Sequence, residues 1–315
     1  MQPFSKSNLI SSSELSAQDI EFLFAAARSF SKDGPAPLLK GKTVVNFFLE
    51  DSTRTRLSFE VATRRLEGQI LGFSASQSSI KKGESFLDTA KNILALKPQA
   101  IVLRHSSAGS PALLAQELKI PIVNAGDGFH EHPTQGLLDA FSLLEKWGTL
   151  KGKRVVIIGD ILHSRVARSN IHVLRKCGAS VAVCGPPSLL PPRLEALGVD
   201  FAYLPEPLLQ SADAVMTLRI QFERQNKMTI PSLSEYRRFW GMTRERAQLL
   251  KKGAIILHPG PVNRGVELDP EVADGPHSII LDQVTNGVLI RMAVLAAVIQ
   301  PKALELTLKE RGAFA

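Results

Sequence analysis

The stretch VVNFFLEDSTRTRLSFEVATRRLEG at residues 44–68 decides the fold. It opens with an apolar run rich in β-branched and aromatic residues, Val44 to Phe48, which predicts a buried parallel strand. Apolar residues then recur at helical spacing, and these are Phe59, Ala62 and Leu66. Gly68 follows them as the expected C-cap of the helix. The stretch therefore predicts a strand, a polar turn and a helix in succession.

The polar turn, Asp51-Ser52-Thr53-Arg54-Thr55-Arg56, gathers hydroxyls, backbone N–H groups and two guanidinium groups at a helix N-terminus. An anion is favoured there because the helix dipole and the first N–H donors both point toward it. The planar fork of Arg54 suits a phosphate. The alternative is a Ser N-cap followed by a solvated basic turn. Arg54 and Arg56 cannot share a helix face, so one can bind a ligand while the other serves the scaffold.

Length and composition are those of an ordinary globular protein with two domains. At 315 residues the chain exceeds the size of a single core, and its 44% hydrophobic content is typical. We find no apolar stretch of the roughly 18 residues that a membrane span needs, and residues 1–15 lack the core of a signal peptide, so we expect a cytoplasmic protein. Cys177 and Cys184 predict neither a disulfide nor a metal site, and we expect both thiols in the core.

The formal charge of +8 does not indicate nucleic acid. The basic residues are dispersed, 6% of the residues are aromatic, and the sequence has neither an arginine-rich tail nor a stacking platform. Small anionic substrates explain the excess of positive charge equally well. We therefore expect neither a nucleic-acid partner nor a membrane partner.

Strands and helices alternate along the chain, which predicts an α/β protein with two doubly wound parallel sheets. The expected strands lie at 44–48, 100–105, 122–126, 154–159, 180–184, 200–203, 213–218 and 254–258. The expected helices outside the opening stretch lie at 14–30, with a cap near Ser16, and at 86–96, 111–118, 132–148 and 285–299, and further helices are expected between the strands from 154 to 258. The polar stretch at 74–85 has no apolar periodicity and predicts a mobile surface loop.

The long helix at 132–148 joins the two alternating sets of elements. We expect residues 1–140 to form the first domain, with a C-terminal helix at 285–310 packing back on it. Residues 141–284 are expected to form the second domain.

Polar side chains follow five of the expected strands, at the carboxyl edge where open α/β sheets bind ligands. They are the 51–56 turn, Arg104, His132, Arg219 and the HPGP turn at 258–261. Arginine, threonine, histidine and glutamine dominate these positions, and carboxylates are nearly absent. One such position would be weak evidence, whereas the shared placement predicts sites for anionic ligands.

Two candidates are ambiguous by themselves. A lone histidine at a helix start, such as His132, is more often structural, although Gln135 one turn later adds a second hydrogen-bonding group on the same helix face. Arg165 opens the helix after the strand at 154–159, where it is either a ligand group or an ordinary surface arginine.

The turn before Arg165 does not predict a dinucleotide site. Its one glycine is Gly159, and Ile161 and Ser164 occupy the other two fingerprint positions. Their side chains would keep the backbone away from a pyrophosphate, which disfavours a nicotinamide oxidoreductase.

The string FxxDSTRTRLSFE resembles the carbamoyl-phosphate signature of the aspartate and ornithine transcarbamylase family, and the match continues in order from about Leu15 to Ile299. The resemblance implies a phosphate cradle, whose residues are Ser52, Thr53, Arg54 and Thr55. It implies that Arg104, His132 and Gln135 surround the carbamoyl group. It also implies that a neighbouring subunit inserts a loop carrying Ser78 and Lys82.

Residues of the second domain indicate the acceptor. The ornithine branch of the family carries an SMG-type motif and an HCLP turn, whereas this chain has LRIQFER and HPGP. The aspartate site is expected to consist of Lys82, Arg165, Arg219 and Gln221, since cations and amides suit a dicarboxylate and would repel ornithine. Gly260 and Pro261 are expected to face the carbamoyl group through the backbone of their turn, with the Gly260–Pro261 peptide in the cis form that X-Pro bonds admit.

The implied reaction is attack by the α-amine of L-aspartate on the carbamoyl carbon, with release of phosphate. The residues expected to act in catalysis are Arg54, Thr55, Arg104, His132 and Gln135. The departing phosphate can accept the amine proton, so no enzymic carboxylate base is expected. No cofactor is expected, and no metal is expected because no second His or Cys stands at ligand spacing from His132. The alternatives are a transcarbamylase with another amino-acid acceptor and a non-catalytic homologue.

The resemblance also implies a homotrimer with shared active sites. Association with a regulatory chain or a dihydroorotase is left open by the sequence.

Overall fold

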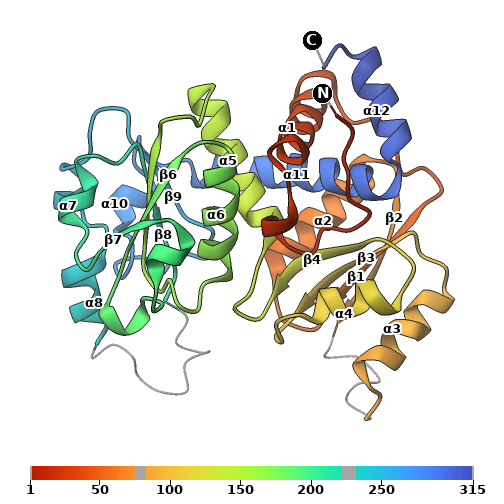
Figure 1. Cartoon of the computed structure of the whole chain (residues 1–315), viewed down its shortest axis with the longest axis horizontal. Coiled ribbons are helices and arrows are strands. Elements are labelled where there is room, and N and C mark those ends of the chain that lie inside the picture. The colour runs from red at the N-terminus through yellow and green to blue at the C-terminus, as the bar shows by residue number, and fades with distance from the viewer. Residues whose placement is uncertain (1, 75–82, 221–231, 314–315) are drawn as a thin grey trace. The chain divides into compact units, whose positions relative to one another are not determined.

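The structure is a computed structural model that describes residues 2–74, 83–220 and 232–313. The chain forms two compact units: unit 1 comprises Met1–Phe141 and Val284–Ala315, and unit 2 comprises Ser142–Gln283. Both boundaries fall inside helices, α5 (Pro133–Trp147) and α11 (Ile280–Ile299), so each of these helices belongs partly to both units (Figure 1).

Unit 1 is built on a four-stranded sheet in the order β2-β1-β3-β4, in which every neighbouring pair is parallel. The strands are β1 (Thr43–Phe48), β2 (Gln69–Ser74), β3 (Ala100–His105) and β4 (Ile122–Asp127). The other helices of the unit are α1 (Ala17–Asp33), α2 (Thr53–Arg65), α3 (Phe86–Ala95), α4 (Ser110–Glu117) and α12 (Pro301–Glu310). Helices α3 and α4 pack on one face of the sheet, and α1, α2 and the unit 1 part of α11 lie on the other (Figure 1).

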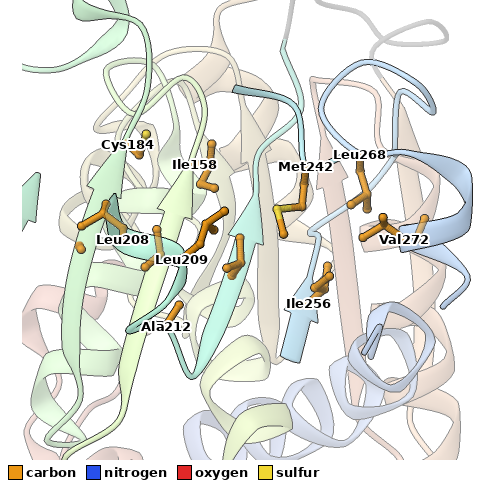
Figure 2. Close-up of a cluster of buried hydrophobic side chains, with 13 residues drawn as sticks. Ile158, Cys184, Leu208, Leu209, Ala212, Met242, Ile256, Leu268 and Val272 are labelled. Carbon is orange, nitrogen blue, oxygen red and sulfur yellow. The ribbon is translucent and has the colours of Figure 1, made fainter. Parts of the chain in front are cut away.

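Unit 2 is built on a five-stranded parallel sheet in the order β7-β6-β5-β8-β9. The strands are β5 (Arg154–Ile158), β6 (Ser180–Cys184), β7 (Asp200–Ala202), β8 (Ala214–Thr217) and β9 (Ile255–Leu257). The helices are α6 (Arg165–Lys176), α7 (Glu206–Leu209), α8 (Leu233–Trp240), α9 (Arg244–Ala247) and α10 (Pro270–Ala273). Figure 2 shows a core cluster on this sheet, in which Ile158, Cys184 and Ile256 of the strands meet side chains of α7 and α10.

Each sheet reverses its strand order at one point. In unit 1 the reversal lies between β1 and β3, and in unit 2 it lies between β5 and β8. The connections on the two sides of such a point leave in opposite directions, so the carboxyl ends there remain uncovered and form the usual ligand position in open α/β sheets. The turn before α2 and Arg104 flank the first point, and Arg165 and Arg219 flank the second.

Several elements agree with the expectations from the sequence. Ser16 caps α1 in a capping box with Asp19, which explains why the helix begins at Ala17. Helix α5 begins at Pro133, and the Gly260–Pro261 peptide is cis.

The structure also contains a strand that the sequence did not predict. β2 lies at the edge of its sheet, and the side chain of Leu71 in this strand is exposed. An edge strand with Gly72 in its middle shows neither a continuous apolar run nor strict alternation, so the usual signal was missing. The expected loop at 74–85 lies mostly on residues 75–82, which are outside the described residues.

Gly68 is not the C-cap of α2, contrary to the expectation. The helix ends at Arg65, Leu66 is its cap, and Glu67 takes the left-handed φ of 60°. A Cβ atom on Gly68 would lie 2.9 Å from Cγ2 of Thr63, so glycine is needed here for close packing.

The C-terminal region is not one helix over 285–310. Helix α11 begins at Ile280, and Pro301 begins the separate helix α12. By length and composition α11 could cross a membrane, so the prediction that no stretch is long enough was wrong. However, 72% of the apolar window of α11 is buried within the protein. A buried core helix meets the same criteria because it too must be apolar on most faces.

Candidate active site

The N-terminus of α2 in unit 1 is open toward solvent. Ser52 occupies the N-cap position, yet its side chain makes no capping hydrogen bond, and the first turn carries no acidic residue. The first helical hydrogen bond runs from the Arg56 N–H to the Ser52 carbonyl at 3.2 Å, so the N–H groups of Thr53, Arg54 and Thr55 precede it. This geometry fits an anion cradle better than the simple Ser cap that was the alternative.

Arg56 makes a contact on the surface of α2. The guanidinium of Arg56 forms an i,i+4 ion pair with Glu60, with 3.8 Å between Nε and Oε1. Arg56 thus serves the helix surface, and Arg54 remains the predicted phosphate ligand.

Arg104 ends the strand next to β1, where it pairs in register with Phe48. Its Nη1 donates to the Ala125 carbonyl at 3.1 Å and its Nη2 donates to Glu50 Oε1 at 3.2 Å. These contacts hold the buried guanidinium at the carboxyl edge of the sheet. Sequence reasoning missed Glu50, although its position directly before the polar turn could have suggested a partner for a nearby cation.

The loop between β4 and α5, which leads to His132, is held by two buried carboxylates. Asp127 accepts hydrogen bonds from Asn124 Nδ2 at 2.8 Å and from the Gly109 N–H at 2.8 Å. Glu131 accepts hydrogen bonds from the hydroxyls of Ser11 and Ser12, which ties the N-terminal segment to the loop. His132 itself is 4% exposed at the start of α5.

Gln135 lies one turn after His132 and is buried. Its Nε2 donates to Asp139 Oδ1 at 2.9 Å, one further turn along α5. The sequence analysis did not single out Asp139, but its i,i+4 spacing from a polar site residue was a usable signal.

In unit 2, Arg165 is the first residue of α6 and is 4% exposed, so the alternative of an ordinary surface arginine is wrong. The N-cap of α6 is Ser164, whose hydroxyl accepts from the Ala167 N–H at 3.0 Å. Arg219 follows the end of β8 and is half-buried. Gln221 lies outside the described residues, as do Ser78 and Lys82.

The turn at 258–261 follows β9 and is held by His258. Nδ1 of His258 accepts from the Gly260 N–H at 2.7 Å, so Nε2 carries the proton and donates to Glu267 Oε1 at 3.2 Å. Glu267 is fully buried and also accepts from the Asn263 N–H at 2.6 Å. Gly260 and Pro261 belong to unit 2, unlike the other described carbamoyl-phosphate candidates.

The two cysteines do not supply a nucleophile. Burial raises the pKa of Cys177 and of Cys184 to about 12, so both thiols stay protonated near neutral pH. Cys184 lies in the core as expected, whereas Cys177 is only partly buried.

Comparison with known proteins matches both units to one family. The sequence model of the carbamoyl-P binding domain of aspartate/ornithine carbamoyltransferases matches residues 7–145. The model of the Asp/Orn binding domain of the same family matches residues 151–298. The aspartate carbamoyltransferase catalytic subunit of Myxococcus xanthus is 52% identical over 279 residues, 88% of this chain and 94% of that protein. That of Opitutus terrae is 51% identical over 298 residues, 93% and 95% of the two chains.

Solved structures share the whole fold. Aspartate transcarbamoylase from Trypanosoma cruzi, in complex with carbamoyl aspartate and phosphate, is 28% identical with a TM-score of 0.86 over 95% of this chain and 99% of that one. Ornithine carbamoyltransferase from Thermus thermophilus is 27% identical with a TM-score of 0.84 over 94% and 100%. The backbone therefore does not by itself separate the two acceptors.

The two parallel-sheet units, each with cations at its switch point, define a two-domain α/β enzyme for anionic substrates. The chain belongs to the aspartate/ornithine carbamoyltransferase family.

The buried Asp127 provides a test of the loop that leads to His132. Burial alone would raise its pKa, but hydrogen bonds from His130, Asn124 and Gly109 outweigh burial and hold the pKa below its ordinary value. We expect Asp127→Asn to lower the free energy of unfolding by about 1–3 kcal/mol at pH 7, because an amide NH₂ would face buried donors.

Because the folded-state pKa of Asp127 is lowered, its contribution is complete above the unfolded pKa of about 3.9 and is lost as the pH falls through the folded value. Urea unfolding at pH 7 and at about pH 3 should therefore show the difference between wild type and variant shrinking at the lower pH. Asp33→Asn, at the exposed end of α1, is the control and should change stability by less than about 0.5 kcal/mol. A difference that is equal at both pH values would contradict this account.

Proposed function

We propose that the protein transfers the carbamoyl group of carbamoyl phosphate to the α-amine of L-aspartate, giving N-carbamoyl-L-aspartate and phosphate, a step of pyrimidine biosynthesis. The choice of aspartate as the acceptor rests on one observation. About half of the aligned residues are identical to those of aspartate carbamoyltransferase catalytic subunits, over nearly the whole chain. Complexes of a solved relative with carbamoyl phosphate and aspartate support the same pair of substrates. Assaying purified protein for carbamoyl aspartate from both substrates tests the proposal.

The roles proposed for the unit 1 residues are those that the family resemblance implies. Ser52, Thr53, Arg54 and Thr55 bind the phosphate at the open N-terminus of α2. Thr55, Arg104 and His132 donate to the carbamoyl oxygen and stabilise the tetrahedral oxyanion, a contribution of about 3–4 kcal/mol for each well-placed donor.

In the reaction, the amine nitrogen forms a bond to the carbamoyl carbon and the bond from that carbon to the phosphate oxygen breaks. The departing phosphate takes the amine proton. Among the described carboxylates near the predicted site, Asp127, Glu131 and Asp139 accept hydrogen bonds from protein donors and Glu50 pairs with Arg104, which agrees with a reaction that uses no carboxylate base.

In this proposal aspartate, the acceptor of the carbamoyl group, binds at the edge of the second sheet. Arg165 and Arg219 stand at the switch point of unit 2 and offer two guanidinium forks, which suit the two carboxylates of aspartate. A substrate with an ammonium side chain would be repelled there.

Arg54→Ala should lower kcat/KM at least about tenfold, equal to about 1.4 kcal/mol of transition-state stabilisation, because a phosphate partner is lost at an exposed helix start. Steady-state kinetics with both substrates measures the effect. Arg56→Ala is the matched control on the same helix, and it should cost little because an exposed i,i+4 pair contributes only about 0.3–0.5 kcal/mol. Nearly normal kcat/KM in Arg54→Ala would remove the phosphate cradle from the proposal.

Arg219→Ala should raise the KM for aspartate far more than the Kd for carbamoyl phosphate, because Arg219 ends a strand of the second sheet. Kinetics gives the first quantity and calorimetry gives the second. Arg168→Ala, at an exposed position of α6, should change neither. Equal effects of Arg219→Ala on the two ligands would refute an acceptor-specific role.

The proposal includes a cytoplasmic homotrimer with shared sites, in which Ser78 and Lys82 of one chain serve the neighbouring chain. A ring-closing heterologous interface of threefold symmetry gives one such contact per chain.

Mixing two inactive variants tests the shared site. Arg54→Ala and Lys82→Ala chains, unfolded together in equal amounts and refolded, should regain about a quarter of wild-type sites, since one interface in each mixed trimer joins an intact cradle to an intact loop. Each variant refolded alone is the control. If the mixed trimers are as inactive as both parents, Lys82 either acts within its own chain or has no role in the site.

A further inference from the structure

Three helices of unit 1 meet around a buried carboxylate and a buried guanidinium that the mechanism above does not use. Asp139 of α5 is fully buried, and Arg291 of α11 is 4% exposed. The guanidinium of Arg291 lies 5.2 Å from the ring centroid of Phe59, which is one turn beyond Thr55 on α2. Arg291 thus contacts the helix that begins at the phosphate cradle and balances a carboxylate of the helix that carries His132 and Gln135.

The space for Arg291 is tightly limited. A Cβ atom on Gly287, one turn earlier on α11, would lie 2.6 Å from Nη1 of Arg291 and 3.1 Å from Cδ2 of Leu138 on α5. The guanidinium is therefore enclosed by both helices. Burial lowers the pKa of Arg291 to about 10, and the charge of Asp139 opposes that shift, so Arg291 remains a cation near neutral pH.

The carboxylate decides how the amide of Gln135 is turned. An ionised carboxylate can only accept hydrogen bonds, so the Gln135 atom 2.9 Å from Asp139 Oδ1 must be the donor Nε2. The planar amide then turns its acceptor, Oε1, away from Asp139. A glutamine without this partner could present either end of its amide to a ligand.

We propose that Asp139 is a positioning residue that makes Gln135 present Oε1 to the carbamoyl NH₂ group and so selects carbamoyl phosphate over acyl phosphates. Acetyl phosphate is the discriminating compound, because a methyl group of similar size replaces the NH₂ donor. A site with a fixed acceptor rejects the analogue without the donor, since the acceptor is left unpaired. This inference rests on the proposed carbamoyl transfer and deepens it.

The test is the ratio of kcat/KM for carbamoyl phosphate to kcat/KM for acetyl phosphate, with aspartate as acceptor. In Asp139→Asn, which keeps the shape of the side chain, Gln135 can turn over, and the ratio should fall about tenfold. The intrinsic reactivity of the two compounds cancels when variants are compared. A role limited to stability would lower both rates together and leave the ratio unchanged.

A double-mutant cycle identifies Gln135 as the group through which Asp139 acts. Gln135→Leu should lower the ratio by itself, and adding Asp139→Asn to it should lower the ratio no further. The inference is overturned if Asp139→Asn leaves the ratio unchanged. It is also overturned if Asp139→Asn lowers the ratio as much in Gln135→Leu protein as in wild type. Wild-type protein that forms no carbamoyl aspartate would instead overturn the proposed function, so the two failures are distinguishable.

A second pair of variants keeps the test valid if Asp139→Asn does not fold. The variant Asp139→Asn leaves Arg291 as a buried cation without its carboxylate. The double variant Asp139→Asn with Arg291→Met removes both charges and should recover the unfolding midpoint of wild type. The kcat/KM ratio of the double variant should be as low as that expected for Asp139→Asn alone. Arg291→Lys, which keeps the charge, should preserve the ratio, and a low ratio in a folded Arg291→Lys protein would contradict the role of that charge.

Discussion

The parallel direction of every strand in both sheets is the constraint on which the candidate site depends. Because all strands of a sheet end at the same edge, the turns after β1, β3 and β4 come together, and so do those after β5, β8 and β9. Reversal of the strand order leaves two adjacent carboxyl ends uncovered in each sheet. Residues far apart in the sequence, such as Arg54 and Arg104, are thereby brought to one edge.

The charges of unit 1 are arranged by sign. Arginines and helix N–H groups stand at the carboxyl edge, whereas the buried carboxylates Asp127, Glu131 and Asp139 accept hydrogen bonds from protein donors. A carboxylate at the edge would repel an anionic substrate, but one behind it can orient a donor that faces the substrate. Glu50, next to the 51–56 turn, is paired with Arg104.

Unit 2 uses the same principle with a histidine. His258 links the Gly260 N–H to the buried carboxylate of Glu267, so the turn after β9 is held by a relay of two hydrogen bonds. The backbone of the turn is consequently ordered by groups that contact no solvent. In both units, positions at the sheet edge are set by polar groups one layer deeper.

The sequence by itself determined the α/β class, most strands, the capped start of α1 and the cation-rich turn at 51–56, because periodicity, caps and helix N-termini are local properties. Its motifs also indicated the family. The edge strand β2, the close packing at Gly68 and the burial of Arg165 were decided by tertiary structure, since each depends on neighbours distant in sequence. The charges of Asp139 and Arg291 likewise interact although their helices are distant in the sequence. Only the fold brings such charges close enough for one to compensate the burial of the other.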